Sequence, residues 1–460
     1  MRALLIMPPL PQRMGAPYLG QQYVAAALID AGHEVRCVDL SAAESDGCDE
    51  LALAAAADFR PHLIGMTLFT VNALHGYRLA EALRTSGALL VAGGPHATVL
   101  PEEPLAHGFD VVVSGEGEHA ILAIADWHAG HRSLDGVPGI TRAAPGHLHG
   151  GACSVPRQAI DDLDALPFPG LSHASYDATA YGTHNAVPVT GGMMTSRGCP
   201  ARCTFCANYV TGRVYRWRSA ANVVGEMRQL QAQHGVTHFS FWDDAFTAQR
   251  RRLNDLCDAL AREPALTGTT WSCITPANMV RPHDLARMRE AGCVAVNFGI
   301  ESGDPAVLKS IKKGQRPEQT LDAVRAARAE GMTTIVNLMF GFPGEGVAEL
   351  DNTQQLMAEL APHTDLFNNR GVLIPMPGTA VYEQWHQRFG FARWWLDERY
   401  LAREPDMFAM DAREADDFLD IDPALEHDFF QYAPEVRSKI GELVRAKAAH
   451  NRETLRATNA

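Results

Sequence analysis

The sequence lacks any run of about 20 apolar residues, so no segment is predicted to cross a bilayer as a helix. Its first residues, MRALLIMPPLPQ, reach prolines before the apolar core of a signal peptide could develop. Low-complexity tracts and repeats of a fixed short period are also missing. We therefore expect a globular protein of the cytoplasm.

Positively charged residues are fewer than negatively charged ones. Lys and Arg number 40 against 54 Asp and Glu, which gives a net charge of −14. This balance would repel a nucleic-acid backbone or an anionic membrane, so we expect neither as a partner. A small molecule or a peptide is the expected substrate. With 460 residues, 46% of them hydrophobic, the chain can build two or three ordinary domains.

Paired cysteines are scarce as well. The nine cysteines are an odd number, and six of them lie singly, as buried thiols in a reducing compartment usually do: Cys37, Cys48, Cys153, Cys257, Cys273 and Cys293. The other three, Cys199, Cys203 and Cys206, form a cluster. A disulfide framework is therefore not expected.

Alternation of strands and helices organises most of the chain. Residues 1–135 repeat short apolar strands and helices, which predicts a doubly wound, Rossmann-like α/β domain with a parallel sheet. Residues 136–185, rich in Gly, Pro, His and Ser, are expected to be an extended connector. Six further strand–helix units over residues 186–390 predict a partial (βα)6 barrel. Residues 391–460 are expected to form a helical C-terminal segment.

The clustered cysteines occur in SRGCPARCTFCANY, directly after the first expected barrel strand. A [4Fe–4S] cluster normally takes four thiolates, so three would leave one iron open for a ligand. Zinc competes for such spacings but needs a fourth Cys or His, and His234 and His238 offer no tight pairing. Three incidental core cysteines are the remaining alternative, although a polar Gly/Pro/Arg loop is an unusual place for them.

With Phe205 beside the last cysteine, this loop resembles that of the radical SAM superfamily, in which the open iron binds S-adenosylmethionine (SAM). The resemblance continues in FWDDAFT, GIESGD and GFPGE, which end the second, fourth and fifth expected barrel strands. It implies that Phe205 contributes to the SAM site, that Asp243 and Asp244 bind the SAM ammonium, and that Glu301 and Ser302 contact its ribose or carboxylate. The plainer alternatives are a helix N-cap for the aspartate pair, and turns for GIESG and GFPGE.

GGPHAT and SGEGE, each at a strand end of the first domain, resemble the cobalamin-binding domain that precedes the barrel in one branch of this superfamily. IDDLDALPFPG in the connector and IKKGQ after the fourth barrel strand also match that branch. The implied cobalamin cradle comprises Thr67, Phe69, Gly93, Gly94, Pro95, His96, Ala97, Glu116 and Gly117. The D-x-H-x-x-G signature that supplies a cobalt ligand is absent, since LSAAES follows Asp39. His96 could replace that ligand, or it could simply hydrogen-bond within the domain.

The resemblance implies a cobalamin-dependent radical SAM methyltransferase acting on an unactivated carbon of a small molecule or peptide. Its cofactors would be a [4Fe–4S] cluster, SAM and cobalamin, with an external one-electron reductant such as flavodoxin or ferredoxin. A non-methylating enzyme with the same cofactors, performing cyclisation, ring contraction or oxidation, remains an alternative. A non-catalytic cobalamin or iron–sulfur binding protein is the alternative of another class. No residue is predicted to be catalytic in its own right.

Overall fold

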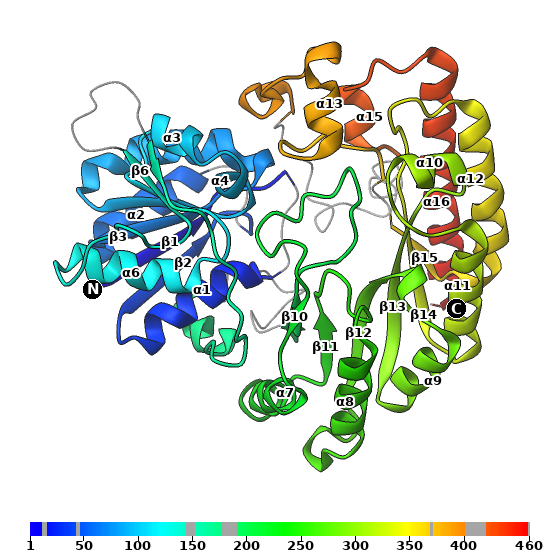
Figure 1. Cartoon of the computed structure of the whole chain (residues 1–460), viewed down its shortest axis with the longest axis horizontal. Helices are drawn as coiled ribbons and strands as arrows, with labels where there is room; N and C mark the ends of the chain where they lie inside the picture. The colour runs from blue at the N-terminus through cyan, green and yellow to red at the C-terminus, as the bar shows by residue number, and fades with distance from the viewer. Residues whose placement is uncertain are drawn as a thin grey trace. The chain divides into compact units, whose positions relative to one another are not determined.

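The structure is a computed structural model that describes residues 1–11, 16–42, 47–143, 152–176, 191–368, 371–400 and 420–458. Its contacts divide the chain into two compact units (Figure 1). The first unit contains Met1–Thr190, Ala207–Gly212 and Arg393–Pro405. The second contains Gly191–Cys206, Arg213–Ala392 and Asp406–Ala460. Each unit is therefore assembled from pieces that lie far apart in the sequence.

A parallel sheet forms the centre of the first unit. Its strands are β1 (Arg2–Met7), β2 (Glu34–Asp39), β3 (Leu63–Thr67), β4 (Leu89–Gly93) and β5 (Val111–Val113), in the spatial order β2-β1-β3-β4-β5. Helices α1 (Leu19–Asp30) and α6 (Glu118–His128) pack together on one face, and α2 (Cys48–Phe59) and α3 (Ala73–Leu83) on the other. The expected doubly wound α/β fold is confirmed. In such sheets, ligands bind beyond the carboxyl ends of the strands.

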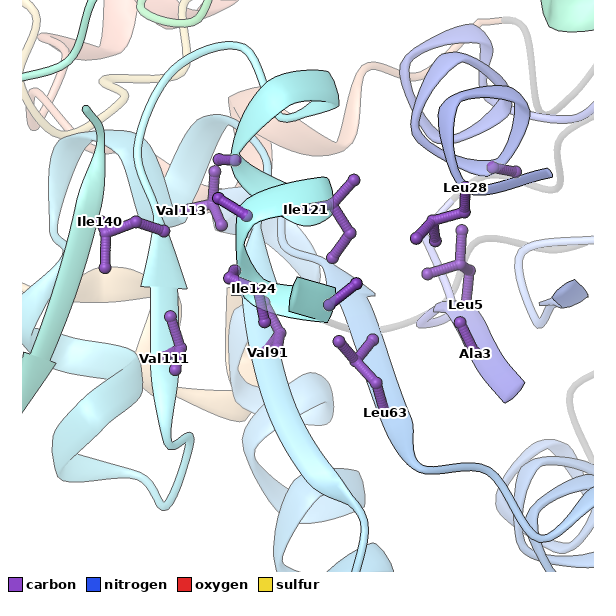
Figure 2. Packing of buried hydrophobic residues seen from close by; sticks show 14 of the residues in the cluster. Ala3, Leu5, Leu28, Leu63, Val91, Val111, Val113, Ile121, Ile124 and Ile140 are labelled. Atoms are coloured by element: carbon purple, nitrogen blue, oxygen red, sulfur yellow. The ribbon is translucent and has the colours of Figure 1, made fainter. Parts of the chain in front are cut away.

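Figure 2 shows the core between this sheet and its helices. Ile121 and Ile124 of α6 lie over Leu63 and Val91 of the central strands, all of them buried. Near-continuous apolar runs such as RALLIM suit strands that are covered on both faces. This packing fixes the strand ends from which the candidate ligand-binding loops emerge.

The segment expected to be a connector contributes to the sheet instead. Strands β6 (Ile140–Ala143) and β7 (Ala152–Ser154) continue it beyond β5 in antiparallel pairing. Ile140 belongs to the buried core, a contribution that the surrounding Gly, Pro and His residues obscured in the sequence. Of the six single cysteines, Cys153 is exposed on the edge strand β7, whereas the other five are buried as expected.

Six parallel strands build the second unit, in the order β15-β14-β13-β12-β11-β8. They are β8 (Gly192–Met193), β11 (His238–Phe241), β12 (Thr270–Pro276), β13 (Cys293–Glu301), β14 (Thr333–Leu338) and β15 (Leu366–Phe367). The intervening helices are α7 (Ala220–His234), α8 (Arg250–Ala261), α9 (Pro282–Glu290), α10 (Pro305–Ser310), α11 (Pro317–Ala329) and α12 (Val347–Leu360). Since β8 and β15 are both edge strands, this is the open, partial barrel that the sequence predicts.

Helices follow the barrel strands and protect one edge. After α13 (Ala380–Phe389), the described part of the C-terminal region contains α15 (Pro423–His427) and the long α16 (Pro434–Thr458). The Asn451 amide of α16 accepts a hydrogen bond from Phe367 N (2.8 Å) and donates one to Phe367 O (2.7 Å). A side chain thus occupies the free backbone groups of edge strand β15, which would otherwise invite pairing with another strand. Among the described helices, none is long and apolar enough to span a membrane.

Candidate active site

The cysteine loop begins at the short strand β9 (Ser196–Arg197), which pairs with β10 (Arg216–Trp217). Cys199 and Cys203 are half-buried and Cys206 is exposed. Thr204 N donates to Ile311 O (2.9 Å), which anchors the loop to the segment after α10. Burial raises the pKa of the Cys199 and Cys203 thiols, while the positive charge of Lys313 lowers it. Because thiolates are the metal-binding form, this cation favours ligation.

The chemistry of the donor set fits an iron–sulfur cluster. Three soft thiols stand on one loop, which is the ligand pattern of a cluster with an open iron. In the described ranges, no three His, Cys, Asp or Glu side chains are gathered closely enough to hold a metal ion. In a [4Fe–4S] cluster each thiolate binds a different iron, so the three thiols do not need to meet at a single ion.

The two aspartates of FWDD have different environments. Asp243 is only 1% exposed, and its carboxylate accepts from Thr195 N (2.6 Å), Thr195 Oγ1 (2.5 Å) and Ser196 Oγ (2.7 Å). The buried Arg252 of α8 adds an ion pair at 3.2 Å. Asp243 thus ties the strand segment that leads into the cysteine loop to α8. Its oxygens are already occupied by these donors, which leaves little capacity for an external ammonium.

Asp244, in contrast, is exposed, and its negative charge acts on Cys199. Its position makes it the better candidate of the pair for the SAM ammonium. The alternative of a helix N-cap is not realised at either aspartate. Helix α8 begins at Arg250, and its N-cap is Gln249, whose side chain accepts from Arg252 N.

Glu301 ends β13 and forms a buried ion pair that the sequence did not reveal. Lys313 Nζ lies 2.6 Å from Glu301 Oε1, and both side chains are almost fully buried. Glu301 and Lys312, the residue before Lys313, have left-handed backbones (φ 72° and 54°), which are strained for residues with a Cβ. Strain of this kind at a strand end is typical of a functional site. IKKGQ supplied the only sequence signal for Lys313, without indicating its role.

Ser302 and Phe205 differ in how accessible they are. Ser302 is fully buried; its hydroxyl lies 3.2 Å from Thr353 Oγ1 and accepts from Asp304 N. These bonds fix the turn that follows Glu301. Phe205 is half-buried, and its ring packs against Phe342 at 5.6 Å between centroids. A direct ligand contact is thus easier for Phe205 than for Ser302.

The GFPGE turn is held by its own glutamate. Glu345 Oε2 accepts from Gly341 N (2.6 Å) and Phe342 N (3.1 Å), and Tyr432 Oη donates to Gly341 O (2.9 Å). Among the described residues, Glu345 Oε1 has no hydrogen-bond partner. Burial raises the pKa of Glu345 to about 7, although the two backbone donors oppose this effect. The turn therefore presents Phe342 to Phe205 from a position fixed by a buried acid.

Two glycines at the carboxyl end of β4 suit a cofactor cradle in different ways. A Cβ added to Gly93 would meet no atom of the described residues within 4 Å, so open space lies beside it in this part of the structure. Gly94 has φ +93°, and a Cβ there would lie 2.8 Å from Leu68 O, so only glycine fits. The pair lets the chain turn sharply while its backbone stays open to a bulky ligand. This geometry fits the bound cofactor expected from the sequence.

The other residues expected in the cradle form two groups, one half-buried and one buried. Thr67, Phe69, Pro95 and Gly117 are half-buried at strand ends, where a ligand could reach them. His96, Ala97 and Glu116 are buried. Glu116 Oε2 accepts from Ile160 N (2.6 Å), which holds the segment after β7 against the sheet. His96, Ala97 and Glu116 thus support the loops from the interior of the domain.

His96 is 0% exposed, and both of its ring nitrogens are engaged. Nδ1 lies 3.3 Å from Thr70 Oγ1, while Nε2 lies 3.0 Å from Tyr77 Oη and 3.1 Å from Glu103 Oε1. A ring nitrogen could bind cobalt only after these bonds were broken. The geometry favours the alternative in which His96 hydrogen-bonds within its own domain.

Comparisons with known proteins identify the two domains. Residues 16–125 match the B12 binding domain, and residues 193–357 match the radical SAM superfamily. An uncharacterized methyltransferase of Pyrococcus horikoshii is 30% identical over 395 residues, or 83% of each chain. The cytidylyl-2-hydroxyethylphosphonate methyltransferase of Streptomyces wedmorensis is 29% identical over 385 residues, covering 72% of this chain and 71% of that protein.

The fold is likewise that of a solved enzyme. The radical S-adenosylmethionine methyltransferase TsrM of Kitasatospora setae matches with a TM-score of 0.69 at 22% identity, over 85% of this chain and 76% of that chain. A structure of TsrM contains cobalamin and a [4Fe–4S] cluster. The expected family and cofactors are confirmed: a [4Fe–4S] cluster, SAM and cobalamin. The chain belongs to the radical SAM enzymes that have a B12 binding domain ahead of the radical SAM domain.

Proposed function

We propose that this enzyme is a cobalamin-dependent methyltransferase that transfers a methyl group from methylcobalamin to an unactivated carbon of a small molecule or a peptide. The main support is a relative named as a methyltransferase that is 30% identical over 83% of both chains. It therefore aligns across both the B12 binding domain and the radical SAM domain. A second relative named as a methyltransferase covers 72% of the chain.

Residues of the second unit would hold the cluster and SAM. When bound, these cofactors supply a 5′-deoxyadenosyl radical, and cobalamin supplies the methyl group. Cys199, Cys203 and Cys206 would ligate three irons and leave the fourth for SAM. Asp244 is placed to attract the SAM ammonium, and the Lys313–Glu301 pair offers opposite charges to carboxylate and hydroxyl groups. Asp243 would act indirectly, by holding Thr195 and Ser196 just before the loop.

Residues of the first unit would hold cobalamin. Gly93 offers open space, Gly94 provides the sharp turn, and Thr67 and Phe69 lie at the neighbouring strand end. With His96 engaged inside the domain, we expect cobalt to receive no histidine from this loop. An external one-electron reductant such as flavodoxin or ferredoxin would supply the electron that reduces the cluster.

The products formed from SAM test the proposal. The chain is reconstituted anaerobically with iron, sulfide and cobalamin, reduced, and supplied with SAM and pools of small molecules and peptides. Mass spectrometry should detect S-adenosylhomocysteine together with 5′-deoxyadenosine. Deoxyadenosine alone, with a demethylated SAM product absent, would point to the cyclising, ring-contracting or oxidising alternative. No product from SAM would favour a non-catalytic binding protein.

A pair of cysteine variants controls this experiment. Cys203→Ala removes a cluster ligand and should abolish deoxyadenosine completely. Cys153→Ala changes an exposed cysteine on β7 of the first unit and should leave the yield unchanged. If Cys203→Ala still formed deoxyadenosine, the cluster assignment would be wrong.

A further inference from the structure

A short segment beyond the barrel belongs to the cobalamin-binding unit. Arg393–Pro405 groups with the first unit, although more than 200 residues separate it from most of that unit. We call its described part, residues 393–400, the clasp segment. It contains two 3-10 turns, η9 (Trp394–Leu396) and η10 (Glu398–Tyr400), and η9 packs against α3. The B12 binding unit therefore includes a piece outside residues 16–125, which match the domain family.

Glu103, in α5 (Glu102–Ala106), accepts hydrogen bonds from two residues of the clasp segment. Its Oε1 accepts from Trp395 Nε1 (2.8 Å) and Tyr77 Oη (2.9 Å) and lies 3.1 Å from His96 Nε2. Its Oε2 accepts from Arg393 Nη2 (3.2 Å). Burial alone would raise the pKa of Glu103, but the hydrogen bonds of His96, Trp395 and Tyr77 lower it to about 2. The clasp segment thus supplies two of the donors around a buried, ionised carboxylate.

His96 connects this carboxylate to the loops of the cradle. It lies in α4 (Pro95–Val99), immediately after Gly93 and Gly94, and its ring also stands edge-on to Trp395 at 5.5 Å. Its other nitrogen reaches Thr70, next to Phe69 at the end of the neighbouring strand. A continuous series of contacts therefore leads from the clasp segment through Glu103 and His96 to both loops.

We propose that the clasp segment is part of the cobalamin site, with Trp395, Arg393 and Glu103 as positioning residues that hold the β3 and β4 loops in their cofactor-binding form. The proposal rests on the assignment of this unit to cobalamin. None of the three residues needs to touch the cofactor. Each acts through His96, which contacts both loops.

Two features argue against simple packing of an aromatic residue. A Trp that only fills space needs no carboxylate partner, whereas Trp395 is 2% exposed and its indole N–H donates to a carboxylate shared by three other side chains. Arg393 also has a left-handed backbone (φ 53°), a strained conformation that persists where the surroundings fix it. The exposed ion pair between Glu398 of this segment and Arg78 of α3 adds little, because water screens it.

The test compares Trp395→Phe and Arg393→Gln with Arg399→Gln as the matched control. Arg399 lies on the same segment, and its contacts there are an ion pair with Asp397 and a cation–π contact with Tyr400. Hydroxocobalamin is titrated into the full-length chain and followed by its absorption spectrum. We expect about ten-fold weaker binding for the first two variants, as for the loss of a hydrogen bond to a charged group. Arg399→Gln should bind as the parent chain does.

Hydrogen–deuterium exchange separates positioning from general destabilisation. In Trp395→Phe, exchange should rise in residues 67–70 and 93–99, while β1 and α1 keep the parent rates. Unchanged affinity and exchange in both test variants would overturn the proposal. So would faster exchange throughout the unit, since the segment would then be only a stability element. If the parent chain itself bound no cobalamin, the proposed function would fail, and the two failures are therefore distinguishable.

Discussion

Asp243→Asn is the substitution that most directly tests how the barrel site is built. It keeps the size of the side chain but removes a charge that is buried together with Arg252. The remaining amide oxygen can still accept from one donor, while the new NH2 group would face another donor. Removing one partner of a buried ion pair costs about 3–5 kcal/mol. We expect about 3 kcal/mol, because one acceptor is retained.

This loss should reach the cluster, since Asp243 holds Thr195 and Ser196 in front of the cysteine loop. After reconstitution, Asp243→Asn should therefore contain less iron and sulfide per chain. Asp244→Asn is the matched control, because it is the same chemical change at an exposed position one residue on. It should alter the free energy of unfolding by less than about 0.5 kcal/mol and leave the iron content unchanged. Its SAM affinity should nevertheless fall.

Three measurements decide the matter: urea unfolding of the barrel unit, iron and sulfide content, and SAM binding to the reconstituted chain. The reasoning fails if Asp243→Asn keeps the parent stability and iron content but loses SAM affinity. Asp243 would then contact the ligand, and its network with Thr195 and Arg252 would contribute little.

Further substitutions probe other parts of both units. Lys313→Met leaves the Glu301 carboxylate buried without its partner and should destabilise the barrel by about 3 kcal/mol in urea unfolding. The control is Lys312→Met, at the exposed preceding residue, which should change the free energy of unfolding by less than about 0.5 kcal/mol. The pKa of Glu345 in the folded chain, about 7, is above its ordinary value of 4.5, so the stability it contributes is full below pH 4.5 and is lost as the pH rises through 7. Relative to the parent, Glu345→Gln should therefore gain stability between pH 5 and 8, by up to about 3 kcal/mol, and a pH-independent difference would contradict this origin. Gly93→Val should leave unfolding of the first unit nearly unchanged, because its side chain enters open space, yet weaken hydroxocobalamin binding in a spectroscopic titration by about ten-fold or more. Equal cobalamin affinity would remove Gly93 from the cradle.

Local patterns predicted the fold well. The six barrel strands and the five parallel strands of the first unit follow from apolar runs and helical spacing, which act over a few residues. The cysteine loop also follows from local spacing. Strands β6 and β7 were not predicted, because they are short and polar on one side. Their antiparallel pairing, β6 with β5 and β7 with β6, is specified by the sheet and not by their own composition.

The roles of individual acids could not be read in the same way. Asp243 and Asp244 are adjacent in sequence, but only Asp243 meets Thr195, 48 residues earlier in the chain. His96 has a side chain that can bind a metal, yet its Nε2 is already engaged by Glu103 and Tyr77. Glu103 in turn is held by Trp395, 292 residues further on. Such contacts depend on the folded chain, and nothing in the spacing of either partner indicates them.

Buried acids serve a common structural purpose in the two units. Asp243, Glu103, Glu116 and Glu345 each accept hydrogen bonds that hold a loop near the carboxyl end of a strand. Loops at this edge must approach bulky cofactors, so they cannot be fixed by dense apolar packing on their ligand side. A carboxylate behind the loop can fix it from the protein side, with several directed bonds at once. In this chain, ligand contacts are therefore expected from accessible residues of the strand ends, such as Asp244, Phe69 and Gly93. Substitutions of the buried acids should instead disturb cofactor binding by changing the positions of the loops.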